Sequence, residues 1–304
     1  MLTGCVARRR GGVTLVELMA TVAVAGAVLA IVAAVALRQQ RTFAALSADA
    51  ALAGQLRDAA SVLPSDLRTA AVGAGDLREA TDTSIEIRET LASAVVCDTL
   101  GKAVILAPFG GTAATFAGAM APIQVGDTAW ILSPDDSAHT WLGRGVLGVS
   151  SAHAGQCMAG GPRLSVPALA APRTALTLDS VSAPLTLVGR PVRVTRPIRY
   201  SLYRASDGSW YLGARDWNDA SAKFNTTQPL AGPFRSPGAG PVFRWFDSAG
   251  VVLAPPVGRR DQVALVRIDL RGQTRSADRV LGSAWNTGPR SDSVSIFVAV
   301  RNRP

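Results

Sequence analysis

The chain has 304 residues, 48% of them hydrophobic and 17% charged, which is enough for one large domain or two small ones. Its 31 basic and 22 acidic residues give a net charge of +9, but beyond the first ten residues the arginines are mostly scattered among apolar residues. A nucleic-acid interface needs basic residues clustered with aromatic ones, so we expect no nucleic-acid partner.

The start of the chain carries a long apolar run. Arg8-Arg9-Arg10 and Gly11-Gly12 precede the stretch from Val13 to Leu37, in which Glu17 is the only charged residue. As a helix these 25 residues would rise about 37 Å, more than the roughly 30 Å hydrocarbon core of a bilayer. We therefore predict a transmembrane helix at 13–37.

Glu17 lies inside this apolar run. A carboxylate in a membrane segment costs a few kcal/mol, so it calls for a cationic partner and indicates a function. Cutting the chain after Gly12 would create an α-amine at Val13 with a pKa near 8, largely protonated at neutral pH. Such an amine on a neighbouring copy could pair with Glu17.

These residues resemble the leader of type IV pilins and type II secretion pseudopilins. Gly12 matches the residue before the cut, Val13 the first mature residue and Glu17 the glutamate at the fifth mature position. One departure is Val13, where phenylalanine is usual. The resemblance implies that residues 1–12 form a leader removed by a prepilin peptidase. It also implies that Val13 is N-methylated and that Glu17 acts in subunit assembly.

Three alternative functions of the N-terminal segment fit its sequence less well. A Sec signal peptide has a shorter apolar core and no acid in it, although Ala23-Val24-Ala25 imitates its cleavage site. An uncleaved signal anchor explains the arginines but not Gly11-Gly12 or Glu17. Leu2 to Cys5 imitates a lipoprotein box, yet no apolar segment precedes it.

The helix is predicted to continue outside the membrane over residues 38–63. This stretch contains no proline, and one face is apolar at spacings of three and four residues. That face comprises Phe43, Leu46, Ala50, Ala53, Leu56, Ala60 and Leu63. Pro64 should end or kink the helix, with a short second helix over 65–72. The apolar face is expected to lie against the downstream domain, residues 64–304.

That domain is predicted to be rich in β-strands. The strand-like segments are 84–89, 93–97, 103–106, 127–132, 146–150, 176–178, 185–188, 192–195, 199–204, 209–215, 242–246, 251–253, 263–270 and 294–300. The clearest hairpin turns at Asp207-Gly208, because glycine supplies the positive φ of a tight turn. The expected fold class is therefore α+β.

The order of the later segments resembles that of the PilW-like minor pilins and J-type pseudopilins. The hairpin from Tyr200 to Arg215, the segment from Phe243 to Gly250, and the end at Arg301-Asn302 carry this likeness, which does not cover residues 101–190. It implies a pilin-like fold, with one long N-terminal helix packed on an antiparallel β-rich domain.

Two cysteines outside the leader are candidates for a disulfide. Cys5 would be removed with residues 1–12, which leaves two cysteines, Cys97 and Cys157, in an exported domain where disulfides can form. Closing this loop would stabilise the fold by up to about 4 kcal/mol. The alternative is two buried free thiols.

Catalytic and metal-binding patterns are weak, so we expect no enzyme, no cofactor and no metal. The two histidines are His139 and His153. Cys157 follows His153 by four residues, but on a predicted loop, where this spacing does not imply that the two side chains lie on the same side. Asp135-Asp136 and Asp216 with Asp219 could offer oxygens to calcium, but neither pair has the spacing of an EF-hand.

The resemblance thus implies a minor pilin or pseudopilin, a structural or initiator subunit of a filament. Its expected partners are prepilin peptidase, other pilins or pseudopilins, and the bacterial inner membrane. A single-pass protein of this kind would place its globular domain in the periplasm or, in a filament, at the cell surface. The alternatives are a pilus-tip adhesin or DNA-uptake receptor, and a signal-anchored periplasmic protein.

Overall fold

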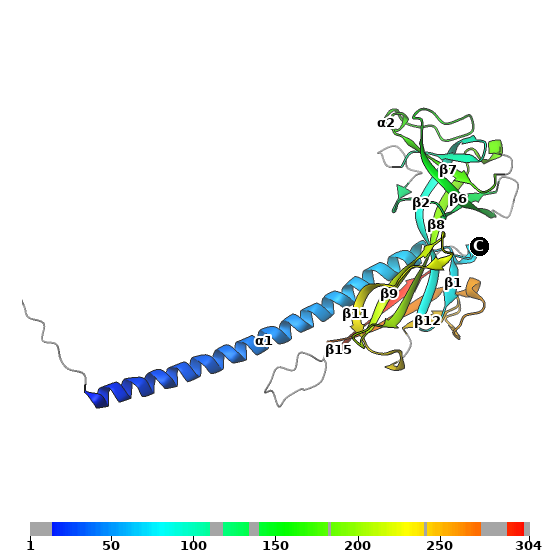
Figure 1. The fold of residues 1–304 in the computed structure, drawn as a ribbon. Helices are drawn as coiled ribbons and strands as arrows, with labels where there is room; N and C mark the ends of the chain where they lie inside the picture. The colour runs from blue at the N-terminus through cyan, green and yellow to red at the C-terminus, as the bar shows by residue number, and fades with distance from the viewer. Residues whose placement is uncertain are drawn as a thin grey trace, which may run out of the picture. The chain divides into compact units, whose positions relative to one another are not determined.

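A computed structural model describes residues 14–109, 118–133, 140–181, 184–239, 242–274 and 291–300. The fold is α+β, as expected: one long N-terminal helix, α1 (Leu15–Thr69), precedes antiparallel strands (Figure 1). The chain divides into two compact units. One contains residues 1–51 with 274–290, and the other contains residues 52–273 with 291–304.

The described strands of the second unit join in one antiparallel sheet, ordered β1-β2-β3-β7-β6-β5-β8-β9-β11-β14-β12-β13, with β4, β10 and β15 paired at its sides. The strands are β1 (Leu77–Ala80), β2 (Ser84–Leu100), β3 (Ala103–Leu106), β4 (Gly118–Ala119), β5 (Thr128–Leu132), β6 (Trp141–Ala152), β7 (Arg173–Leu178), β8 (Pro191–Arg204), β9 (Trp210–Asn218), β10 (Lys223–Phe224), β11 (Gln228–Phe234), β12 (Phe243–Phe246), β13 (Val252–Leu253), β14 (Leu265–Gln273) and β15 (Ser291–Ala299). The short helices are α2 (Val166–Leu169), η1 (Val72–Ala74), η2 (Pro184–Leu187), η3 (Pro237–Ala239) and η4 (Arg260–Gln262).

The predicted break at Pro64 is wrong. The helix runs through Pro64 to Thr69, and the separate helix expected over 65–72 is its last part, followed by η1. Proline removes one helical hydrogen bond. Here Leu63 and Leu67, one turn apart, are both fully buried in the domain core, and that packing outweighs the lost bond.

The predicted apolar face of residues 38–63 is only partly correct. Phe43 and Leu46 are 70% and 58% exposed, so the first turns of this stretch do not pack as expected. The buried face begins at Leu52 and is made of Leu52, Leu56, Ala59, Leu63 and Leu67. Burial of this face therefore starts at the boundary between the two units.

Two long strands, β2 and β8, run through both hydrophobic cores of the second unit. They pair from Ser84–Ser201 to Val95–Pro191, with a bulge between Thr90 and Ala92. The first core combines the end of α1 with residues 72–87 and 198–298 of the sheet. The second core is built only from residues between Leu91 and Val194, and we call this segment the insert.

The strand predictions are largely confirmed, and the main hairpin has the expected form. Strands β8 and β9 pair Tyr203 with Tyr211 and Arg204 with Trp210, and Gly208 has a φ of 80° in the turn. The segments predicted at 84–89 and 93–97 are one strand, β2, and those at 192–195 and 199–204 are one strand, β8. The strand predicted at 185–188 is wrong, because residues 184–187 form η2.

Candidate functional site: the N-terminal helix and the insert

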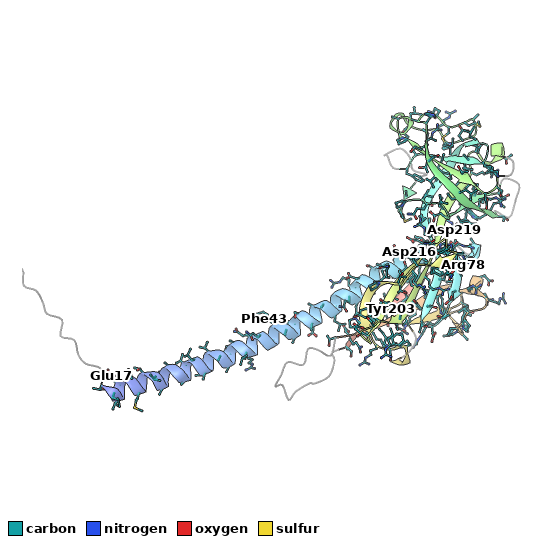
Figure 2. The ribbon with its side chains drawn as sticks, in the orientation of Figure 1. Glu17, Phe43, Arg78, Tyr203, Asp216 and Asp219 are labelled. Carbon is teal, nitrogen blue, oxygen red and sulfur yellow. A yellow bond between two sulfur atoms is a disulfide. The ribbon has the colours of Figure 1, made fainter. Side chains whose placement is uncertain are left out.

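The described chain enters α1 through a polar cap. The Thr14 hydroxyl accepts a hydrogen bond from the backbone N–H of Glu17 at 3.3 Å, and the Thr14 carbonyl accepts one from Leu18 at 3.1 Å. Glu17 lies in the first turn (Figure 2). A negative charge is favourable there because the helix dipole is positive at its N-terminus. This geometry fixes Glu17 at the first turn of the apolar helix.

Apolar side chains cover all sides of α1 beyond this cap. Every residue from Leu15 to Leu37 is exposed, with Leu15 and Val16 at 75% and Met19 at 65%. The stretch is long and apolar enough to cross a membrane, and none of it is buried within the protein. An exposed apolar surface of this extent requires a lipid or protein environment.

Glu17 forms no ion pair with any residue that the structure describes. Gly12 and Val13, the residues expected at the cut and at N-methylation, lie outside the described residues. The proposed partner of Glu17, the Val13 amine of a neighbouring copy, is therefore still a prediction.

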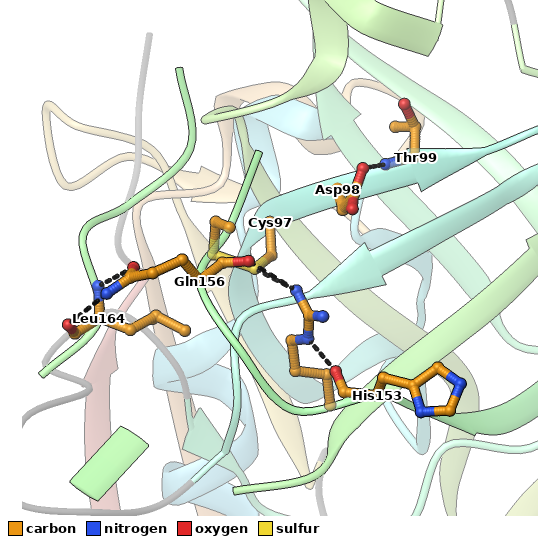
Figure 3. The surroundings of a disulfide bond; sticks show 8 residues. Cys97, Asp98, Thr99, His153, Gln156 and Leu164 are labelled. Carbon is orange, nitrogen blue, oxygen red and sulfur yellow. Dashed lines mark hydrogen bonds between the residues drawn. A yellow bond between two sulfur atoms is a disulfide. The ribbon is translucent and has the colours of Figure 1, made fainter. Parts of the chain in front are cut away.

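Within the insert, Cys97 and Cys157 are joined in a disulfide (Figure 3). Cys97 is fully buried at the end of β2, and its carbonyl accepts a hydrogen bond from Met158 at 3.0 Å. The Gln156 side chain pairs with the backbone N–H and C=O of Leu164, both at 3.3 Å. The disulfide and these bonds hold the loop after β6 against β2.

Arg173 reinforces the same loop from β7. This buried guanidinium donates hydrogen bonds to the carbonyls of His153 and Gln156 and lies 3.2 Å from the Cys97 sulfur. Because Cys157 is in the disulfide, it has no free thiol to act as a nucleophile beside His153. Sequence spacing gave no sign of Arg173, since it lies 76 residues from Cys97.

The two acidic pairs weighed for calcium do not form a cluster in the described chain. Asp135-Asp136 lies outside the described residues. Asp219 packs against Gly126, where an added Cβ would lie 2.2 Å from the Asp219 Cβ, and Gly126 has a φ of 93°. The described residues hold no group of three or more metal-ligating side chains.

A second set of carboxylates lies where the end of α1 meets β2, β8 and β9. Tyr200 donates a short hydrogen bond to Asp66 of α1. Burial raises the pKa of the nearby Glu89, and the negative charges of Asp66 and Asp216 raise it further, whereas Arg196 opposes the shift. Burial and the neighbouring negative charges therefore make this carboxylate costly to ionise.

Asp76 is a fully buried carboxylate that no local sequence pattern marks as special. It accepts hydrogen bonds from both terminal nitrogens of Arg193 at 2.5 and 3.1 Å and from the backbone N–H of Ala71 at 2.7 Å. Arg88 lies farther away, 4.0 Å from the other oxygen. The contact joins residues 117 positions apart, so only the fold brings them together.

Comparison with known proteins gives no relative: no protein-family model, no curated protein and no solved structure matches the chain.

Proposed function

We propose that this chain is a minor pilin or pseudopilin, a structural subunit of a type IV pilus or type II secretion pseudopilus. The observation that supports it best is the N-terminal helix. Its residues from Leu15 to Leu37 expose apolar side chains on all sides, and its one charge, Glu17, lies in the first turn without a partner in the described chain.

The same helix suits such a subunit both before assembly, in the membrane, and after assembly, in the filament. The stretch from Leu15 to Leu37 rises about 35 Å, enough to anchor the protein in the inner membrane before assembly. In a filament, the apolar surfaces of neighbouring helices would cover one another. The carboxylate of Glu17 would then pair with the charged Val13 amine of the next subunit, which removes the cost of an isolated charge in an apolar core.

The β-rich unit and its disulfide favour an exported location. A disulfide persists in oxidising compartments such as the periplasm and is rare in the cytosol. This supports the expected orientation, with the basic residues before Val13 on the cytoplasmic side. The size of the unit, with an insert that has its own hydrophobic core, fits by analogy a minor subunit at a filament tip.

The test has two arms in cells that carry the matching peptidase and filament proteins. Mass spectrometry of the mature chain should find Val13, N-methylated, as the first residue. Glu17→Ala should be cut normally but should enter sheared filaments about tenfold less than the wild type, since about 1.4 kcal/mol corresponds to a factor of ten.

Asp58→Ala is the matched control, because Asp58 is an exposed carboxylate on the same helix. It should be cut and assembled as the wild type. A mature chain that keeps residues 1–12 would exclude the proposal. Normal assembly of Glu17→Ala would remove the role assigned to that carboxylate.

A further inference from the structure

A polar cavity lies beside β1 in the second unit. It has a volume of about 420 Å³, within the range of small-ligand sites. Its lining residues come from η1, β1, β2 and the loop that carries η4. They are Val72, Gly73, Gly75, Leu77, Arg78, Arg88, Gly258, Arg260 and Asp261. Three guanidinium groups therefore face one space, against one carboxylate.

Arg88 is the most constrained of the three. Its guanidinium carbon lies 4.6 Å from the ring centre of Trp130, and one terminal nitrogen donates to the Gly75 carbonyl at 3.1 Å. Its nearest carboxylate, Asp76, is 4.0 Å away and is already held by Arg193. Burial lowers the pKa of Arg88, which indicates a cation that its neighbours do not fully compensate.

The other two arginines also keep free donors. Arg78 lies 3.3 Å from Glu86, but Glu86 is held more closely by Arg199, at 2.7 Å. Arg260 forms no ion pair with any described residue. The cluster around the cavity has five arginines and four carboxylates, which leaves one positive charge in excess. Its members are Arg78, Arg88, Arg193, Arg199, Arg260, Asp76, Glu79, Glu86 and Asp261.

We propose that this cavity binds a carboxylate on an acidic peptide segment of a partner protein. A guanidinium presents its N–H groups as a planar fork that matches the two oxygens of a carboxylate. Arg260 forms no ion pair with any described residue, and the carboxylates nearest Arg78 and Arg88 are held more closely by other arginines, so all three can bind a further carboxylate. The excess positive charge then attracts the segment to the site.

The lining argues for a peptide over an acidic sugar. None of the lining residues is aromatic, so a sugar ring would find no surface on which to stack. Three of them are glycines, Gly73, Gly75 and Gly258, which have no side chain to cover the main-chain groups that an extended segment could contact. This proposal does not depend on the cut after Gly12, so it can fail while the filament proposal stands.

Isothermal titration of the full chain in detergent micelles tests the site. The probes are a blocked acidic tetrapeptide, acetyl-Gly-Asp-Glu-Gly-amide, and its neutral counterpart with asparagine and glutamine. The acidic peptide should bind at least about tenfold more tightly, because a hydrogen bond to a charged group contributes about 1.5–3 kcal/mol. Its affinity should fall as salt is added.

Two variants and one control locate the binding. Arg260→Ala should weaken the acidic peptide about tenfold without lowering Tm, whereas the neighbouring Arg259→Ala, outside the cavity lining, should change it less than about twofold. Gly258→Leu should block the cavity without disturbing the fold, because an added Cβ at Gly258 meets no atom within 4 Å.

Four outcomes would overturn the proposal. They are no binding of the acidic peptide at about 5 mM, equal binding of the acidic and neutral peptides, equal effects of Arg259→Ala and Arg260→Ala, or glucuronate or phosphate binding as tightly as the peptide. The last result would indicate a sugar site or a general anion site.

Discussion

The two parts of α1 show one helix built for two different surroundings. From Leu15 to Leu37 the apolar side chains are exposed all round, whereas from Leu52 to Thr69 only one face is apolar and it is buried. The first part has no packing against the described protein and requires a lipid or protein environment. The second gains its stability from the protein's own sheet. A change of the same chemical kind should therefore destabilise the folded unit in the second part and leave its stability unchanged in the first.

The largest effect is expected from shortening a buried leucine. Leu63→Ala should lower the free energy of unfolding by about 2–5 kcal/mol, because it leaves a cavity among fully buried residues. Leu29→Ala, at a residue that is 67% exposed, should leave the unfolding of the β-rich unit unchanged. Urea denaturation in micelles, followed by tryptophan fluorescence, measures both. Equal losses would show that the two parts of the helix are not energetically distinct.

A smaller effect should come from filling the groove in which the helix lies. At Gly272 of β14, an added Cβ would lie 2.5 Å from a Leu52 methyl group and 3.4 Å from Leu56. Gly272→Val should therefore cost about 1–3 kcal/mol by overpacking. Gly26→Val is the control, since nothing lies within 4 Å of an added Cβ at Gly26. The same denaturation curves report the outcome, and an unchanged midpoint for Gly272→Val would contradict the close approach.

The smallest effect is a pH dependence at the packed end of the helix. Since the pKa of Glu89 is raised in the folded protein, folding favours its protonated form, and stability falls as pH rises above the ordinary value of 4.5. Glu89→Gln should raise Tm at pH 7 by about 2 °C and should have a much smaller effect at pH 4, where Glu89 is mostly neutral in both states.

The exposed Asp58→Asn on α1 serves as the control for Glu89→Gln. Thermal unfolding of both variants between pH 4 and pH 7 gives the comparison. A stabilisation by Glu89→Gln that is the same at both pH values would exclude desolvation of the carboxylate as its cause.

The apolar helix, most strands and the main hairpin could be predicted from the sequence because their signals are local. A run without charges from Leu18 to Leu37, alternation along 84–89 and Asp207-Gly208 each span a few consecutive residues. The continuation past Pro64 could not be predicted, because the burial of Leu63 and Leu67 that maintains it comes from distant strands. Local propensity is overridden where tertiary packing is strong.

The candidate sites also differ in whether a local sequence signal marks them. Glu17 stood out because a single charge in an apolar run is visible in the sequence, and Cys97 and Cys157 stood out by their even count. The cavity beside β1 did not, because Arg88 and Arg260 are 172 positions apart and look like ordinary surface arginines. Their significance depends on which carboxylates are already held by other arginines, which is a property of the folded protein.

The pairing of β2 with β8 has a consequence for how this protein can change over evolutionary time. Ala92 and Val194 face each other in the ladder, so the insert begins and ends at adjacent positions of the β2–β8 pair. Its hydrophobic core uses only its own residues. The segment can thus be lengthened, exchanged or replaced by a short turn while the strands around the helix keep their register. The surface of the insert can therefore vary without a change in the part of the sheet that packs against α1.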